Sequence, residues 1–234
     1  MIIIKKPMSD CNCIDCDNRF CAFTVLNDSE IKLLCNNHAE VRFKKKEIII
    51  KQGALTTNVV YIKSGLVKEH ITGPNKKEEI LQIVKSPFFL GIHAMFSDRI
   101  NQYSLTALED TTVCFINSEI LKILLRKNSE FTYQILMHVC KDQINNFQQC
   151  VNKIQKCLHG CVADAILYLA DKIYESDHFK LSITRNDIAG LIGTSRECVS
   201  RALAKFSKEG IIDLNNKTVK ILNKSLLQKI SEVG

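Results

Sequence analysis

The chain has 234 residues, 46% of them hydrophobic and 24% charged, with a formal net charge of +7. These proportions are those of an ordinary globular protein, and the length allows two modest domains with separate cores. No run of about 20 apolar residues is present, so we expect no membrane span. The short apolar run at residues 2–4 is flanked wrongly for a signal peptide. We therefore predict a cytoplasmic protein.

Four of the eleven cysteines lie within residues 11–21, at Cys11, Cys13, Cys16 and Cys21. A reducing cytosol argues against disulfides, so clustered thiols predict metal or redox chemistry. Thiolates on one short polar loop select zinc or an iron–sulfur cluster. Their spacing is not that of a common zinc ribbon, and unligated thiols on a mobile tail stay an alternative. We assign residues 1–21 to a cysteine-rich N-terminal loop.

Residues 22–126 are predicted to form a sensor domain built mainly of short strands. An amphipathic helix is expected over residues 26–35, with Asn27 or Asp28 as its N-cap. Strands are predicted over residues 47–51, 59–63, 66–71, 79–84, 104–108 and 111–116. Glycines at the joins suit turns that need a positive φ. This spacing predicts a β-barrel or jelly roll.

Part of this roll, residues 51–68, resembles the cyclic-nucleotide-binding domains. Members that bind cyclic AMP carry a Gly-Glu pair for the ribose and an Arg-Ser pair for the phosphate. Here the corresponding pairs are Gly91-Ile92 and Gln102-Tyr103. A buried phosphate without a cation is heavily penalised. We therefore expect no cyclic nucleotide to bind.

Residues 127–160 are predicted to form a dimerisation helix. Apolar residues recur from Met137 to Cys161 in alternating steps of three and four, the repeat of a helix that pairs with its own copy. The expected homodimer interface comprises Met137, Cys140, Ile144, Phe147, Val151, Ile154 and Leu158. The alternative is an ordinary core helix of a globular domain.

Residues 161–234 have the pattern of a winged helix-turn-helix domain. Thr184 caps a first helix, Gly193 and Thr194 make a turn, and Ser195 caps a second helix. Residues 211–214 and 218–221 then predict the two strands of a wing. From Asp177 onward ten Lys and Arg residues stand against six acidic residues, which is compatible with a phosphate backbone as partner.

The second helix has an apolar inward face and a polar outward face, as a helix in a major groove requires. Arg201 suits guanine, Glu197 suits cytosine, and Ser200 suits a thymine or adenine edge. The phosphate contacts are expected from Thr184, Arg185, Thr194 and Ser195. Arg196 is the remaining residue predicted to point outward from the second helix. The predicted partner is double-stranded DNA.

With both ends interpreted, the chain resembles the CRP/FNR superfamily of bacterial transcription regulators from Cys11 to its end. The DNA-binding signature lies within residues 184–201, and Glu197-x-x-Ser200-Arg201 is its FNR-type form. This resemblance implies an α+β fold with a cyclic-nucleotide-binding-like β-roll, a long dimerisation helix and a winged helix-turn-helix. It also implies binding to TTGAT-like inverted repeats and contact with RNA polymerase.

FNR-type regulators hold a [4Fe–4S] cluster through three N-terminal cysteines and one in the roll. The resemblance implies Cys13, Cys16, Cys21 and Cys114 as ligands, with Cys11 as a possible substitute. The gap between Cys16 and Cys21 is one residue shorter than in the family pattern. On strand grounds alone, Cys114 is equally well a small buried apolar residue. Loss of the cluster to oxygen or nitric oxide is expected to weaken the dimer and its DNA affinity.

No phosphate-binding loop, H-E-x-x-H or G-x-S-x-G motif occurs, so we expect no enzyme. Two alternatives to the oxygen sensor remain open. One is the same DNA-binding dimer with another signal, such as zinc, thiol oxidation, haem or a small ligand, or with no metal. The other is a metal-binding scaffold whose basic helix is incidental.

Overall fold

The computed structural model describes residues 21–234, and the chain is an α+β protein as predicted. The described residues fall into two compact units. The first contains residues 21–71 and 84–143, and the second contains residues 72–83 and 144–234. Within residues 21–234, no helix combines the length and the apolar character that crossing a membrane requires.

The β-roll contains two antiparallel four-stranded sheets. Their strand orders are β1–β8–β3–β6 and β2–β7–β4–β5. The strands are β1 (His38–Phe43), β2 (Ile48–Ile50), β3 (Asn58–Ser64), β4 (Leu66–Thr72), β5 (Glu78–Lys85), β6 (Phe88–Leu90), β7 (Ser104–Ala107) and β8 (Thr111–Asn117). The helices of this part are η1 (Cys21–Val25), α1 (Asp28–Cys35), α2 (Ile92–Phe96), α3 (Ser118–Lys127) and α4 (Ser129–Gln155).

Six strands were predicted from the sequence, and each is confirmed to within a few residues. Two strands of the roll, β1 and β6, were missed. Residues 38–43 do alternate between polar and apolar side chains, so β1 had a local signal that the prediction did not use; its polar residue Glu40 is only 5% exposed and accepts a hydrogen bond from Lys63 Nζ at 2.7 Å. A charge on a buried strand position is tolerated because it is paired there. Strand β6 directly follows Pro87, and a proline beside a short apolar run argues against a strand prediction.

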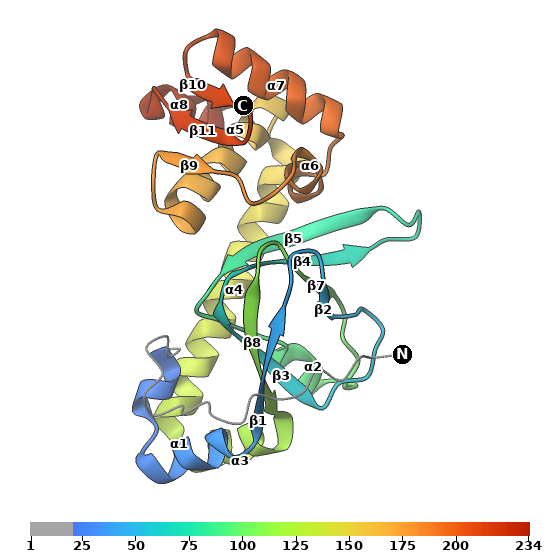
Figure 1. Cartoon of the computed structure of the whole chain (residues 1–234), viewed down its shortest axis with the longest axis vertical. Coiled ribbons are helices and arrows are strands. Elements are labelled where there is room, and N and C mark those ends of the chain that lie inside the picture. The colour runs from blue at the N-terminus through green and yellow to red at the C-terminus, as the bar shows by residue number, and fades with distance from the viewer. Residues whose placement is uncertain (1–20) are drawn as a thin grey trace. The chain divides into compact units, whose positions relative to one another are not determined.

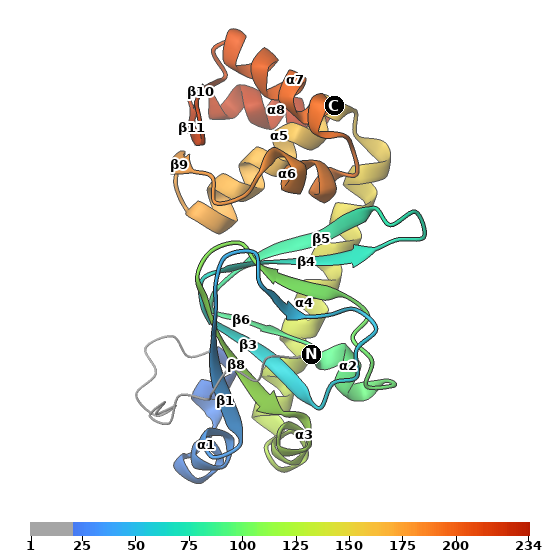
Figure 2. The same cartoon turned by 45° about the vertical axis from the view of Figure 1, so that its right-hand side comes forward.

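One face of the first sheet is covered by helices, and this interface forms a core. Alternate residues of β3 and β8 point into it because successive side chains of a strand face opposite sides. The cluster includes Val59, Tyr61, Cys114 and Ile116 from the strands, with Ala22, Phe23, Leu26, Leu34, Leu121, Leu124 and Phe131 from the helical side. Figures 1 and 2 both show α1 and α3 side by side at one end of the roll.

Helix α1 begins as predicted, with Asn27 as its N-cap. The Asn27 side chain accepts from the Glu30 backbone N–H at 3.0 Å, and the Glu30 carboxylate accepts from the Asn27 backbone N–H at 3.0 Å. Asn128 Nδ2 donates to the same carboxylate at 3.0 Å, which links α1 to the start of α4. These two donors, the Asn27 backbone first, lower the pKa of Glu30 below its ordinary value of 4.5.

We expect Glu30→Gln to destabilise the protein by about 1–2 kcal/mol at pH 7. The depressed pKa means that folding favours the ionised carboxyl. The ionised carboxyl of Glu30 therefore adds to the free energy of unfolding at pH values above its ordinary pKa of 4.5. This stabilisation is lost as the pH falls through the lower pKa of the folded state. Chemical denaturation at pH 7 and pH 3 measures the difference. The exposed acid Asp28 in the same turn gives a control, Asp28→Asn, and an unchanged Glu30→Gln deficit at pH 3 would contradict the assignment.

Helix α4 carries the predicted dimer seam, and the seam is largely exposed in a single chain. Phe147 is 62% exposed and Ile154 78% exposed, and Met137, Ile144 and Val151 also count among the large exposed hydrophobic residues. Cys140 is exposed too. An apolar stripe that the chain's own core leaves uncovered is typical of an interface.

The predicted continuation of this helix to Cys161 is wrong. Helix α4 ends at Gln155, and Cys157 has an extended backbone with φ −69° and ψ 168° as N-cap of the next helix, α5 (Leu158–Tyr168). Leu158 therefore lies in the first turn of α5, apart from the other seam residues. The apolar spacing continues across the break because α5 is itself a buried helix, with Cys161, Val162 and Ile166 in its core.

The C-terminal unit is built from short helices and a three-stranded antiparallel sheet. After α5 come the π-helical turn η2 (Leu169–Tyr174), β9 (His178–Lys180), α6 (Arg185–Ile192), α7 (Arg196–Lys208), β10 (Ile212–Asn215), β11 (Thr218–Ile221) and α8 (Lys224–Val233). The strand order is β10–β11–β9. The predicted helix pair and wing are confirmed, whereas β9 and α8 were missed.

Candidate nucleic-acid interface and cysteine site

The first helix of the helix-turn-helix pair, α6, is fixed by a reciprocal cap. The Thr184 hydroxyl accepts from the Asp187 backbone N–H at 3.2 Å, and the Asp187 carboxylate accepts from the Thr184 backbone N–H at 2.8 Å. The Thr184 hydroxyl also donates to that carboxylate at 2.7 Å. This hydroxyl, predicted to contact phosphate, is thus committed to the cap. The helix ends at Gly193, whose φ of +72° is in the left-handed region that favours glycine.

The second helix, α7, is the candidate recognition helix. Its N-cap Ser195 accepts from the Cys198 backbone N–H at 3.3 Å. Val199, Leu203 and Phe206 are fully buried, as the inward-face prediction requires. The Phe206 ring lies 6.0 Å from the His159 ring of α5, which fixes the helix to the body of the domain.

The outward face of α7 presents the predicted base-reading residues together. Arg196, Glu197 and Arg201 are exposed, and Ser200 is half-buried. Arg185 Nη1 donates to the Ser200 hydroxyl at 3.2 Å, so this arginine of α6 reaches the reading face of α7. Arg185 was predicted to contact phosphate only, because its hydrogen bond to Ser200 depends on how α6 packs against α7.

Cys198 lies among these residues and was not part of the predicted site. Arg201 Nη2 lies 3.3 Å from its Sγ. Hydrogen bonds from Ser195, Arg201 and Thr194, in that order, lower the pKa of the Cys198 thiol to about 7. Ser195 also lowers the pKa of the neighbouring Glu197, after the larger effect of that residue's own backbone N–H.

We expect Cys198 to react with iodoacetamide with a pH midpoint near 7, because the thiolate is the reacting form. Peptide mass spectrometry after timed alkylation from pH 6 to pH 9 measures the midpoint. Arg201→Ala removes one donor and is expected to raise it. A midpoint above 8.5 in the unmodified protein would show that the Arg201 and Ser195 contacts do not act on the thiol.

The wing follows α7 and adds basic residues beside it. Strands β10 and β11 pair from Ile212↔Ile221 to Asn215↔Thr218, and Asn216 at the turn has φ +53°. Lys217 and Lys220 are exposed on this hairpin. Figure 1 shows the hairpin in the same C-terminal unit as α6 and α7. The arrangement suits contacts to phosphates beside a major groove.

Of the predicted metal ligands, Cys114 is fully described. It lies on β8 opposite Tyr61 of β3 and Glu40 of β1, and it is 6% exposed within the helix-covered core. The Phe23 ring of η1 meets the Tyr61 ring edge-on at 5.7 Å. The backbone at Cys21 begins η1, two residues before Phe23. Sheet and helix thus bring the Cys21 segment onto the face of the sheet that contains Cys114.

The other predicted ligands, Cys11, Cys13 and Cys16, lie outside the described residues, as does the side chain of Cys21. Among residues 21–234, no three His, Cys, Asp or Glu side chains are grouped to hold a metal ion. The predicted ligand set therefore depends on thiols of the N-terminal segment in addition to Cys114. The donor set of four cysteines fits an iron–sulfur cluster or zinc.

Two domain families match the chain. The Crp-like helix-turn-helix domain matches residues 162–230, and the cyclic nucleotide-binding domain matches residues 40–128. The chain is 27% identical to the fumarate and nitrate reduction regulatory protein of Vibrio cholerae, over 95% of this chain and 91% of that protein. It is 25% identical to the protein of the same name from Escherichia coli K12, over 94% and 90%. The chain belongs to the CRP/FNR family of transcription regulators.

Solved structures agree with this CRP/FNR fold. FixK2 from Bradyrhizobium japonicum superposes with a TM-score of 0.76 at 18% identity, covering 82% of this chain and 96% of that one. A putative regulator of the crp/fnr family from Eubacterium rectale gives 0.73 at 22% identity, over 91% and 98%. The Crp-like helix-turn-helix match and the curated relatives make the protein a DNA-binding transcription regulator and not an enzyme, which argues against the scaffold alternative.

In this CRP/FNR-family roll, the two residue pairs Gly91-Ile92 and Gln102-Tyr103 are linked by a hydrogen bond. The Gly91 backbone N–H donates to Tyr103 Oη at 2.9 Å. Burial, and then the charge of Glu69, raises the pKa of Tyr103, so its phenol stays protonated. The remaining cavity beside Gly91 and Ile92 is about 10 Å³, the size of one water at most. The expectation that no cyclic nucleotide binds stays a prediction, and this contact between Gly91 and Tyr103 is compatible with it.

Proposed function

We propose that this CRP/FNR regulator is of the FNR type and senses oxygen, or nitric oxide, through a [4Fe–4S] cluster. The cluster controls dimerisation and binding to TTGAT-like inverted repeats. The observation that carries the proposal is the packing of the segment after Cys21 onto the sheet face that contains Cys114. Relatives named as fumarate and nitrate reduction regulators, at 25–27% identity, support the same function.

Three contacts of the roll support this packing. Cys114 and Tyr61 are directly paired across β8 and β3, so their side chains lie on the same face. Phe23 touches Tyr61 and Phe89 edge-on, with ring centroids 5.7 and 5.8 Å apart. Two residues of extended chain reach at most about 7 Å. Cys21 is therefore held within a short distance of the layer that covers Cys114.

Cys13, Cys16, Cys21 and Cys114 would hold the cluster, with Cys11 as a possible substitute. When bound, the cluster supplies reactivity toward oxygen and nitric oxide. Cys114 is fixed in the middle of a sheet, whereas the other three thiols come from one short segment. Shared ligation therefore ties that segment to β8, and loss of ligation releases it.

The output is dimerisation along α4. Pairing buries the exposed seam residues Ile144, Phe147 and Val151 and places two α7 helices about one DNA turn apart, roughly 34 Å. For a sharp response, the ligated state must favour the dimer by a few kcal/mol. RNA polymerase is the further partner expected of a regulator of this type.

Replacement of one ligand tests the function. We expect Cys114→Ser, purified without oxygen, to lose the cluster's iron and to bind an inverted TTGAT repeat as weakly as the air-exposed wild type. Cys150→Ser is the matched control, because Cys150 is an exposed thiol of α4 outside the seam. Circular dichroism verifies folding of both variants.

The result also separates the alternative signals. If metal content and oxygen response both survive in Cys114→Ser, the assigned quartet is wrong. Zinc, thiol oxidation, haem or a small ligand would then become the leading signals for the same DNA-binding dimer.

A further inference from the structure

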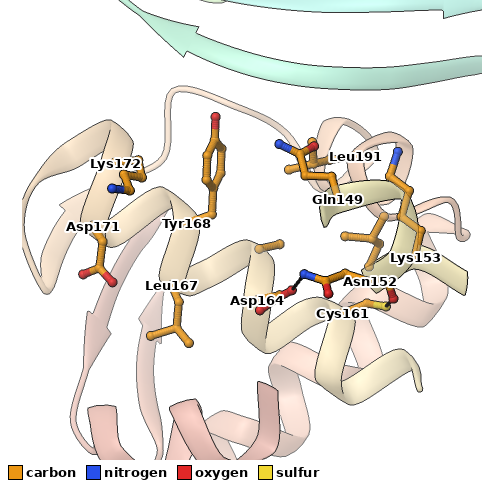
Figure 3. A pocket seen from close by; sticks show the side chains of 12 residues that line it. Gln149, Asn152, Lys153, Cys161, Asp164, Leu167, Tyr168, Asp171, Lys172 and Leu191 are labelled. Atoms are coloured by element: carbon orange, nitrogen blue, oxygen red, sulfur yellow. Dashed lines mark hydrogen bonds between the residues drawn. The ribbon is translucent and has the colours of Figure 1, made fainter. Parts of the chain in front are cut away.

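The C-terminal unit contains a cavity of about 280 Å³ that the DNA-binding function does not use. Its walls come from the last turns of α4, from α5 and η2, and from the end of α6. The apolar part of the lining is Ala165, Leu167, Leu191, Ile192 and the Tyr168 ring. Figure 3 shows Leu167 and Tyr168 along α5, with Gln149, Asn152 and Lys153 from α4.

Most charged groups that line this cavity already have partners. Lys153 Nζ lies 2.7 Å from Glu79 Oε1 and donates to the Ile80 carbonyl at 3.2 Å. Lys156 pairs with Asp164 at 2.8 Å, and Lys224 pairs with Asp171 at 2.6 Å. Lys172 is solvent-exposed. A charged ligand buried in this cavity would lose its hydration and would find no free, buried group of opposite charge. The cavity therefore favours a neutral molecule.

One polar atom at the cavity is shielded from solvent and unsatisfied. Gln149 Oε1 is buried and has no hydrogen-bond partner among residues 21–234. A buried acceptor without a donor is destabilising, whereas a donor supplied by a ligand removes that penalty. Ligand pockets typically combine apolar walls with a few such polar groups.

We propose that this cavity binds a small, neutral, mainly apolar molecule whose single N–H or O–H group donates to Gln149 Oε1. Its volume exceeds the roughly 150 Å³ of an apolar cavity that accepts benzene, so a bicyclic molecule such as indole is of suitable size. The Asn152–Asp164 hydrogen bond of 2.7 Å lies in its wall, and Asp164 also accepts from Ser231 of α8. A bound ligand is therefore expected to change how the end of α4 packs against the DNA-binding helices, and so to change DNA affinity. This consequence rests on the proposed function.

Indole and 1-methylindole are matched probes, because methylation removes the only donor. Titration of the full chain, followed by methyl NMR, is expected to show saturable indole shifts at Ala165, Leu191 and Ile192. We expect about tenfold weaker binding of 1-methylindole, as for loss of one buried hydrogen bond. This comparison uses the unmodified protein and so does not depend on a variant folding.

The variant Gln149→Leu is expected to bind indole about tenfold more weakly and to lose the difference between the two probes. Gln148→Leu, one residue away on the exposed side, is expected to behave like wild type. No saturable shift in the wild type, or equal binding of both probes, would overturn the site.

DNA affinity is measured separately with indole at saturation. A change of at least about threefold is expected, and an unchanged affinity with intact indole binding would overturn only the regulatory consequence.

Discussion

Arg201→Ala is expected to abolish sequence-specific DNA binding while leaving the fold intact. Arg201 is exposed on α7, and its neighbours Val199 and Leu203 carry the packing of the helix. A bidentate contact to guanine contributes about 1–3 kcal/mol per half-site, so two half-sites lose about 2–6 kcal/mol, roughly 30-fold to 10⁴-fold in Kd. Fluorescence anisotropy with an inverted TTGAT repeat, under anaerobic conditions, measures the loss.

The control is Lys205→Ala, four residues further along the same helix. Lys205 is exposed and only loosely paired with Glu209, at 4.0 Å. A phosphate contact there carries no base information, so its loss is expected to weaken binding similarly for all sequences and to lower the salt dependence. If Arg201→Ala still discriminates between the TTGAT repeat and one with its guanines replaced, Arg201 does not read the base.

Phe147→Glu is expected to give a folded protein that does not dimerise. The Phe147 side chain is 62% exposed in the single chain, so the substitution removes little from the chain's own core. In the dimer it removes two buried aromatic rings, each contributing about 1.5–3 kcal/mol, and places two like charges at the seam. The loss of about 3–6 kcal/mol corresponds to a roughly 10²- to 10⁴-fold weaker dimer. Sedimentation velocity without oxygen measures it.

The neighbouring Gln148 provides the control for that experiment. It is exposed and lies outside the apolar repeat, so Gln148→Glu adds the same charge to the outer face of α4. We expect this variant to remain dimeric. A dimer of undiminished strength in Phe147→Glu would place the interface elsewhere than the Met137–Ile154 seam.

The sequence predicted the DNA-binding half of the molecule well because its signals are local. Thr184 and Ser195 cap their own helices, Gly193 adopts the left-handed turn, and Val199 and Leu203 face inward. Each of these features depends on residues within one or two turns of the chain. The missed helix α8 had a comparable signal, since Asn223 caps it by accepting from the Leu226 backbone N–H.

The errors arose where distant contacts decide the structure. The heptad pattern of apolar residues continues past Cys157, but the helix does not. Helix α4 ends before this residue and a new helix, α5, begins after it, because α5 packs in the core of the C-terminal unit. Gly160 lies so close to Gly234 that a Cβ at position 160 would be 2.9 Å from its backbone. A contact between residues 74 positions apart in the sequence leaves no trace in local periodicity. The same holds for Arg185 and Ser200, which meet only after α6 packs on α7.

For the cysteine site, the sequence identified the candidate thiols, and the structure places one of them, Cys114, on β8. Cys114 looked equally like a small core residue, and it is indeed buried. What the sequence did not reveal is that Phe23, two residues after Cys21, packs against Tyr61 on the same sheet face. This proximity depends on the register of β3 and β8, which no local pattern specifies.

The most direct test of the oxygen-sensor account is the iron, sulfide and zinc content of the protein, measured together with its oligomeric state. Protein purified without oxygen should contain about four irons and four sulfides per chain and sediment as a dimer. After exposure to air it should lose its visible absorption and become largely monomeric. A colourless protein that holds stoichiometric zinc, or no metal, and whose dimer is unaffected by air would contradict the account.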